Sequence, residues 1–196
     1  MGRRPAGRHG LIIVTIPVLA WDLSRSRAGF AASKSSDGTP FCGSRSFAYS
    51  GADPGEIGLS FKNTLLDMMK LMRPQIIAIE APVLANVPQD QHDLEIKLGL
   101  LMLARVIAKP QGARVVLGNV QTVRKYFTGS GRPGSTGKES KRIVYDRCLA
   151  LGWKVANTDE SDAAALWAWA SATHDKSCRL ETGALLHRAD AARRVA

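Results

Sequence analysis

Cysteine is scarce in this chain, which excludes several classes of small stabilised domain. Its three cysteines (Cys42, Cys148 and Cys178) stand far apart, with no C-x-x-C pair and no histidine at zinc-finger spacing. Neither a disulfide framework nor a structural zinc site is therefore indicated, and a reducing cytoplasm is the expected location. Long apolar runs are also lacking. No segment reaches the roughly 20 apolar residues that a membrane-spanning helix needs, so no membrane association is expected.

The beginning of the chain imitates a secretion signal without completing it. Arginines precede the apolar stretch 11–20, but no small-x-small cleavage site follows, and the next residues are Trp21 and Asp22. Residues 1–15 are therefore interpreted as a basic arm that leads into a buried strand.

Acidic residues are few: 17 Asp and Glu stand against 27 Lys and Arg, for a formal net charge of +10. This balance favours a polyanionic partner, most commonly nucleic acid, although a solvated basic face would give the same composition. With 196 residues, 45% of them hydrophobic, the chain suits one domain, expected at 16–174. Residues 175–196 are expected to form a basic C-terminal tail.

The hydrophobic pattern predicts an α/β fold. Three consecutive strands open the chain, and helices then alternate with two more strands, which predicts a mixed five-stranded sheet with an antiparallel start, then parallel strands, flanked by helices. The expected strands are 16–23, 28–33, 44–49, 75–80 and 114–117, and the expected helices are 54–72, 91–108, 120–127, 139–151 and 159–173.

Two buried strands of this pattern end in a carboxylate. Asp22 ends the first strand and Glu80 ends the strand that begins at Gln75. Each acid alone could cap a turn or pair with an arginine. However, adjacent parallel strands would bring both carboxylates to the same edge of the sheet. Like charges placed so close are tolerated mainly around a cation, and hard oxygen ligands favour Mg²⁺ or Mn²⁺.

A further acidic pair begins the last predicted helix. Asp159 and Asp162 are three residues apart, so they share one helical face. A purely structural alternative is that Asp159 is the N-cap and that Asp162 interacts with the helix dipole. Together with Asp22 and Glu80, the pair would supply the acids needed for two-metal phosphodiester hydrolysis.

These motifs, in this order, resemble those of the RuvC-type Holliday-junction resolvases, particularly the phage-like branch. The resemblance covers about residues 17–173 and depends on Asp22 in a D-x-S motif, Glu80 in I-E-A-P, the basic stretch VRKYFTGSGRPGSTGKESKRIVYDRC and the motif D-E-S-D-A-A-A-L. It implies a ribonuclease H-like fold, a homodimer, Mg²⁺ that Mn²⁺ can replace, and paired cuts in a four-way DNA junction. The implied catalytic residues are Asp22, Glu80, Asp159 and Asp162 as metal ligands, and Lys138 near the scissile phosphate.

Two features depart from the family pattern. Leu23 and Arg25 follow the first acid where the family has small residues, and the glycine-rich loop before Lys138 is longer than in the housekeeping resolvases. Both departures concern the choice of DNA substrate more than the hydrolytic chemistry.

The basic stretch predicts the DNA-binding surface. Its cations would contact phosphates, whereas Phe127 could either stack on an unpaired base or belong to the core. The predicted DNA-binding residues are Arg124, Lys125, Phe127, Arg132, Lys138, Lys141 and Arg142.

Two other functions remain open on the sequence, and a third is disfavoured. A ribonuclease H-like nuclease that cuts flaps, forks or hybrids would use the same acids on another substrate. A non-catalytic DNA-binding protein of the same fold would keep the basic surface and use the acids as caps. Half of an actin-like sugar kinase shares the strand order, but the short chain lacks a second phosphate-binding lobe.

Overall fold

The computed structural model describes residues 16–25, 27–33, 39–47, 53–82 and 91–175. The expected basic arm at 1–15 lies outside the described residues, as does the expected tail beyond Asp175. No helix in the described ranges has the length and apolar character that crossing a membrane requires.

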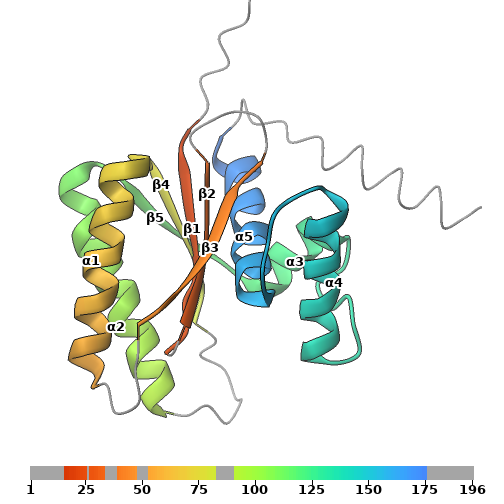
Figure 1. Ribbon diagram of the computed structural model, residues 1–196, viewed down its shortest axis with the longest axis horizontal. Coiled ribbons are helices and arrows are strands. Elements are labelled where there is room, and N and C mark those ends of the chain that lie inside the picture. The colour runs from red at the N-terminus through yellow and green to blue at the C-terminus, as the bar shows by residue number, and fades with distance from the viewer. Residues whose placement is uncertain (1–15, 26, 34–38, 48–52, 83–90, 176–196) are drawn as a thin grey trace, which may run out of the picture.

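The five strands form one mixed sheet in the order β3-β2-β1-β4-β5, as predicted (Figure 1). Strands β1, β2 and β3 pair antiparallel, whereas β4 pairs parallel with both β1 and β5. Their bounds are Val18–Asp22 (β1), Arg27–Ser33 (β2), Phe41–Ser46 (β3), Ile76–Glu80 (β4) and Arg114–Gly118 (β5). Strand β3 begins three residues before the predicted Ser44, because its register is set by pairing with β2, in which Phe41 lies opposite Ala32.

Helices cover both faces of the sheet. Helices α1 and α2 lie on one side of it, and α3, α4 and α5 lie on the other (Figure 1). Their bounds are Pro54–Met72 (α1), Gln91–Ala108 (α2), Val120–Thr128 (α3), Gly137–Ala150 (α4) and Thr158–His174 (α5), with a short 3₁₀ turn, η1, at Lys109–Gln111. All five predicted α-helices are therefore present, with bounds that differ by at most two residues.

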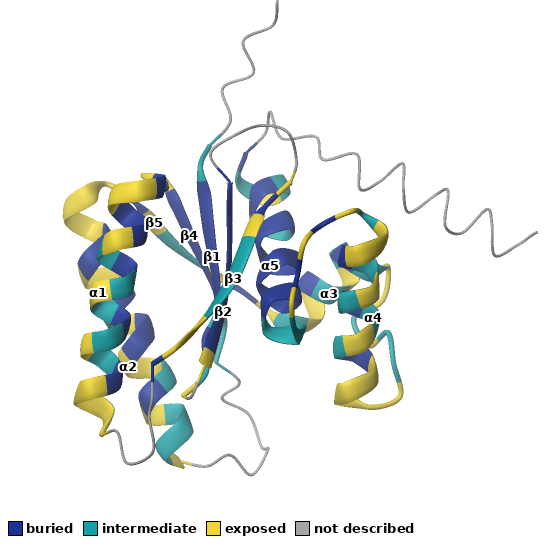
Figure 2. Ribbon diagram, viewed as in Figure 1, coloured by how far each residue is buried: buried dark blue, intermediate teal, exposed yellow. Residues whose placement is uncertain are grey.

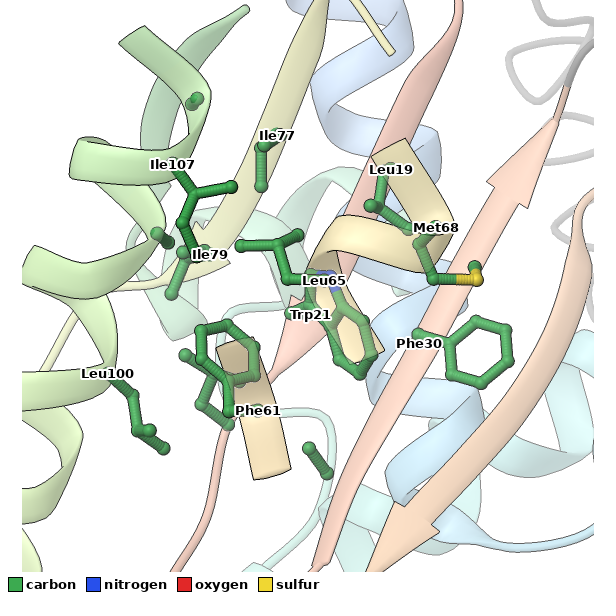
Figure 3. Packing of buried hydrophobic residues seen from close by; sticks show 14 of the residues in the cluster. Leu19, Trp21, Phe30, Phe61, Leu65, Met68, Ile77, Ile79, Leu100 and Ile107 are labelled. Carbon is green, nitrogen blue, oxygen red and sulfur yellow. The ribbon is translucent and has the colours of Figure 1, made fainter. Parts of the chain in front are cut away.

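The alternation of side chains along the strands divides the core into two layers. Leu19 and Trp21 of β1 pack toward α1 and α2, where Trp21 meets Phe61 edge to face at 5.7 Å between ring centroids (Figure 3). Val18 and Ala20 point the other way, into the layer that α5 covers. Both layers are buried, while the outer faces of α1, α2 and α4 are exposed (Figure 2).

Small residues let α5 lie close to the sheet. Its buried positions include a run of alanines, Ala163 to Ala165. On the sheet side, a Cβ added to Gly29 of β2 would lie 2.0 Å from the carbonyl oxygen of Asp159, so only glycine fits there. The first turn of α5 is thereby held directly over β2, beside the end of β1.

Candidate active site

The alternation within the strands directs Asp22 and Glu80 to the same face of the sheet. Alternate residues of a strand point to the same face of the sheet. Asp22 therefore shares a face with Val18 and Ala20, and Glu80 shares one with Ile76 and Ala78. All four of these apolar residues face α5. Trp21 pairs with Ile79 in the parallel ladder, so the next residues on these strands are the two acids. The sequence prediction that they meet at one edge of the sheet agrees with this register.

Helix α5 supplies Asp159 and Asp162 to the same place. Its N-cap is Asn157, whose side-chain oxygen accepts hydrogen bonds from the backbone N–H of Asp159 at 3.1 Å and of Glu160 at 3.0 Å. The structural alternative that Asp159 is the N-cap is therefore wrong. The side chains of both aspartates remain free of this capping role and interact with cations instead.

A pocket of about 200 Å³ lies at the meeting point of these elements. Its wall contains three of the four acids and two lysines: Asp22, Glu80, Asp159, Lys97 and Lys141. The fourth acid, Asp162, is buried beside it, with its side chain only 8% exposed and 3.3 Å from the Nζ of Lys141.

The acids perturb one another electrostatically. Burial, followed by the charges of Glu80 and Asp162, raises the pKa of Asp22 to about 8. Burial also raises the pKa of Glu80, and Asp162 raises it further. The pKa of Asp162 is raised by burial too, although Lys141 and Arg124 oppose that effect. The ionised forms of Asp22, Glu80 and Asp162 are therefore disfavoured, and added positive charge would stabilise them.

Two cations already contact the acids of α5. The Nζ of Lys141 in α4 lies 3.3 Å from Asp162 Oδ2 and 3.6 Å from Asp159 Oδ1. Burial disfavours its charge, but Asp162, Asp22 and Asp159 together raise the pKa of Lys141 above its ordinary value. The guanidinium of Arg27 holds the other oxygen of Asp159, with Nε at 2.8 Å and a terminal nitrogen at 2.7 Å from Oδ2.

The donor chemistry of the pocket suits a hard divalent cation. Carboxylate oxygens are the ligands that Mg²⁺ and Mn²⁺ prefer, and the raised pKa values of Asp22, Glu80 and Asp162 are those of buried acids in need of a counter-ion. Among the described residues, however, no three Asp, Glu, His or Cys side chains stand where they could hold one ion together.

The predicted lysine is in a different place. Lys138, expected near the reacting phosphate, is exposed in the first turn of α4 and is not part of the pocket wall. Lys141, one helical turn later, is the lysine of α4 that contacts Asp159 and Asp162. The rotation of α4 on α5 decides which lysine faces the site, and the sequence does not specify that rotation.

The predicted DNA-binding residues separate into exposed cations and one core aromatic. Lys125, Arg132, Lys138 and Arg142 are exposed on α3, α4 and the loop between them, and Arg124 is half-buried beside the site. Phe127, by contrast, is 1% exposed and packs on Trp153 with ring centroids 5.5 Å apart. The assignment of Phe127 to DNA binding is therefore wrong, because its helical spacing from Val123 places it in the core.

Sequence reasoning missed three residues that shape the site. Arg27 contacts Asp159 across 132 positions of the chain, and nothing in the local sequence indicates that pairing. Lys97 lines the pocket, but its 2.9 Å ion pair with Asp93 resembles an ordinary surface pair four residues apart on a helix. Glu160 is buried, where it accepts from Ser44 Oγ at 3.0 Å and so ties β3 to the start of α5.

Comparisons with known proteins give a fold and no close relative. No protein-family model matches the chain, and no curated protein matches it significantly. Among solved structures, Thermus thermophilus RuvC is similar with a TM-score of 0.61 and 17% identity, over 82% of this chain and 98% of that one. T. thermophilus RuvC in complex with a Holliday junction substrate gives 0.60 and 14%, over 82% and 97%.

A third similar structure is the yeast mitochondrial Holliday junction resolvase Ydc2. Its TM-score is 0.50 at 12% identity, over 84% of both chains. At these identities the likeness establishes the fold, and the predicted ribonuclease H-like architecture of the RuvC type is confirmed.

Proposed function

We propose that this chain, which has the fold of the RuvC-type resolvases, is a Mg²⁺-dependent endonuclease that resolves four-way DNA junctions. The observation that carries the proposal is the convergence of four acids from β1, β4 and α5 on one pocket. Burial and mutual repulsion raise the pKa of three of them. A protein that used these acids only as caps would have no reason to bury them together.

The chemistry assigned to the site is phosphodiester hydrolysis. Two divalent ions, Mg²⁺ or Mn²⁺, would activate the attacking water and stabilise charge on the departing 3′ oxygen. Asp22, Glu80 and Asp162 are the proposed main ligands, and Asp159 contributes from the rim. Lys141 lines the pocket beside Asp162, and we propose that it takes the role expected of Lys138 and contacts a phosphate oxygen on which negative charge develops.

Helices α3 and α4 are the proposed DNA-binding surface. They lie beside α5, and together with the loop between them they carry the exposed cations Lys125, Arg132, Lys138 and Arg142. Phosphate contacts by such cations orient the duplex, and they make the affinity of the protein for DNA depend on the salt concentration. The pocket is lined by Lys141 of α4 and by the ends of β1 and β4, so we propose that a DNA strand bound to α3 and α4 passes the four acids.

The active form is proposed to be a homodimer, because a four-way junction has two equivalent strands to cut. An exposed apolar strip on α2 is suited to contact with a second copy. Leu98, Met102 and Val106 are four residues apart, so they share one face of the helix, and they are 42%, 56% and 61% exposed.

The test is cleavage by the purified protein of four-way, three-way and linear DNA, with Mg²⁺ or EDTA. Junctions are expected to be cut in Mg²⁺ alone, and Asp22→Asn and Asp162→Asn should abolish cutting. Cleavage in EDTA, or by Asp22→Asn, would contradict the mechanism. Preference for flaps, forks or hybrids would keep the chemistry and change the substrate.

Calorimetry separates the nuclease from a non-catalytic DNA-binding protein. The nuclease should bind Mn²⁺ through Glu80, so Glu80→Gln should weaken that binding by at least about ten-fold. Junction binding with no measurable Mn²⁺ site would favour the non-catalytic alternative.

A further inference from the structure

Arg27 holds one oxygen of Asp159 in place at the rim of the pocket. Both its Nε and a terminal nitrogen lie within 2.8 Å of Oδ2, whereas Oδ1 faces the Nζ of Lys141 at 3.6 Å. The carboxylate is 19% exposed and the arginine side chain 49%. A charge-assisted hydrogen bond from Nε and an ion pair with a terminal nitrogen, both to one oxygen, make Oδ2 a poorer ligand for an ion in the pocket.

The backbone of β2 holds Arg27 in position to contact Asp159. Arg27 is the first residue of β2, and its backbone N–H donates to Ser24 Oγ at 3.3 Å. Two residues further along, Gly29 lets the carbonyl of Asp159 approach the strand. Arg27 and Asp159 are therefore brought together by a strand and a helix rather than by a loop.

We propose that Arg27 is a positioning residue that lowers the affinity of the site for divalent ions in the absence of DNA. It keeps Oδ2 of Asp159 from the pocket and leaves that acid one oxygen, Oδ1, to offer. Its own positive charge also repels an ion bound nearby. This inference rests on the proposed function, because it assumes that the pocket binds divalent ions.

The consequence is that ion binding depends on the substrate. Mg²⁺ is commonly held by a few carboxylates together with substrate phosphate oxygens. With Asp159 restrained by Arg27, the phosphates of bound DNA supply a larger share of the ligands, so the site fills when DNA is present. A free protein with weak ion binding is then the resting state.

The test is calorimetric titration of the full chain with Mn²⁺ in the absence of DNA. Arg27→Gln removes both the contacts that restrain Oδ2 and the positive charge, and is expected to tighten Mn²⁺ binding about ten-fold. About five-fold comes from removing one cation about 8 Å from a divalent ion in a solvent-like medium, and about two-fold from the release of Oδ2. Arg27→Lys keeps the charge but cannot hold Oδ2 with two nitrogens, and should tighten Mn²⁺ binding about two-fold. The matched control is Arg45→Gln, an equal loss of charge on the exposed side of neighbouring β3, with no change expected.

A second readout needs neither metal nor activity. In EDTA, Arg27→Gln should melt at a lower temperature than the wild type, because Asp159 loses its partner. In a double-mutant cycle, Arg27→Gln should tighten Mn²⁺ binding less in an Asp159→Asn background, since part of its effect acts through Oδ2.

The outcomes distinguish this inference from the proposed function. If Mn²⁺ binds the wild type and not Asp162→Asn, but Arg27→Gln leaves the affinity unchanged or weaker, the inference is overturned and the nuclease proposal stands. If the wild type binds no Mn²⁺ even with junction DNA, both are overturned. Should Arg27→Gln fail to fold, the two-fold change with Arg27→Lys decides in the same way.

Discussion

Replacing Asp22 by asparagine should stabilise the metal-free protein while removing its nuclease activity. Burial and three neighbouring acids, Glu80, Asp162 and Asp159, raise the pKa of Asp22 from 3.8 to about 8. Between these values the folded protein keeps a proton that the unfolded chain has released. The contribution of Asp22 to stability is therefore fully present below pH 4 and is lost as the pH rises toward 8.

The magnitude follows from the number of protons involved. One proton held only by the folded state lowers the free energy of unfolding by about 1.4 kcal/mol per pH unit. Asparagine has nearly the same shape and does not titrate. The free energy of unfolding of Asp22→Asn minus that of the wild type should therefore increase by about 3 kcal/mol between pH 5 and pH 7.

The assay is urea denaturation of both proteins in EDTA at pH 5, 6, 7 and 8. The difference between them matters, because other carboxylates shift the stability of both proteins together. Adding saturating Mn²⁺ should reduce the advantage of Asp22→Asn, since an ion that binds only the folded wild type stabilises it by mass action. A difference that is flat or falling with pH would refute the electrostatic account of the pocket.

Three further predictions concern packing and DNA binding. Gly29→Ala should cost about 2 kcal/mol of stability and lower the cleavage rate, since its Cβ would lie 2.0 Å from the Asp159 carbonyl oxygen. Denaturation and junction cleavage would test this, with Gly99→Ala as the control because an added Cβ there meets no atom within 4 Å; wild-type behaviour of Gly29→Ala would contradict it. Phe127→Ala should cost about 3 kcal/mol in denaturation but leave the junction affinity of the folded fraction unchanged, whereas a DNA-stacking residue would show the reverse. Lys125→Gln should reduce the slope of log affinity against log salt by about one in titrations with fluorescent junction DNA, and an unchanged slope would remove Lys125 from the phosphate contacts.

The local pattern of the sequence was sufficient to predict the strands and helices of the fold, and to place Asp22 and Glu80 at strand ends. Strand alternation is a property of consecutive residues, so Asp22 and Glu80 could be assigned to strand ends from the apolar residues before them. The parallel pairing of those strands then followed from the order of strands and helices. The helix bounds were predicted within two residues because caps and apolar spacing are also local signals.

Which other side chains reach the acids, and which are buried in the core, depends on how the elements pack on one another. Lys138 and Lys141 are both plausible from the sequence, and only the seating of α4 against α5 directs Lys141 to the acids. The same packing buries Phe127 in the core. Arg27 reaches Asp159 because Gly29 admits the first turn of α5. Such contacts join residues far apart in the chain, so no local periodicity encodes them, and only the tertiary structure decides which charges meet.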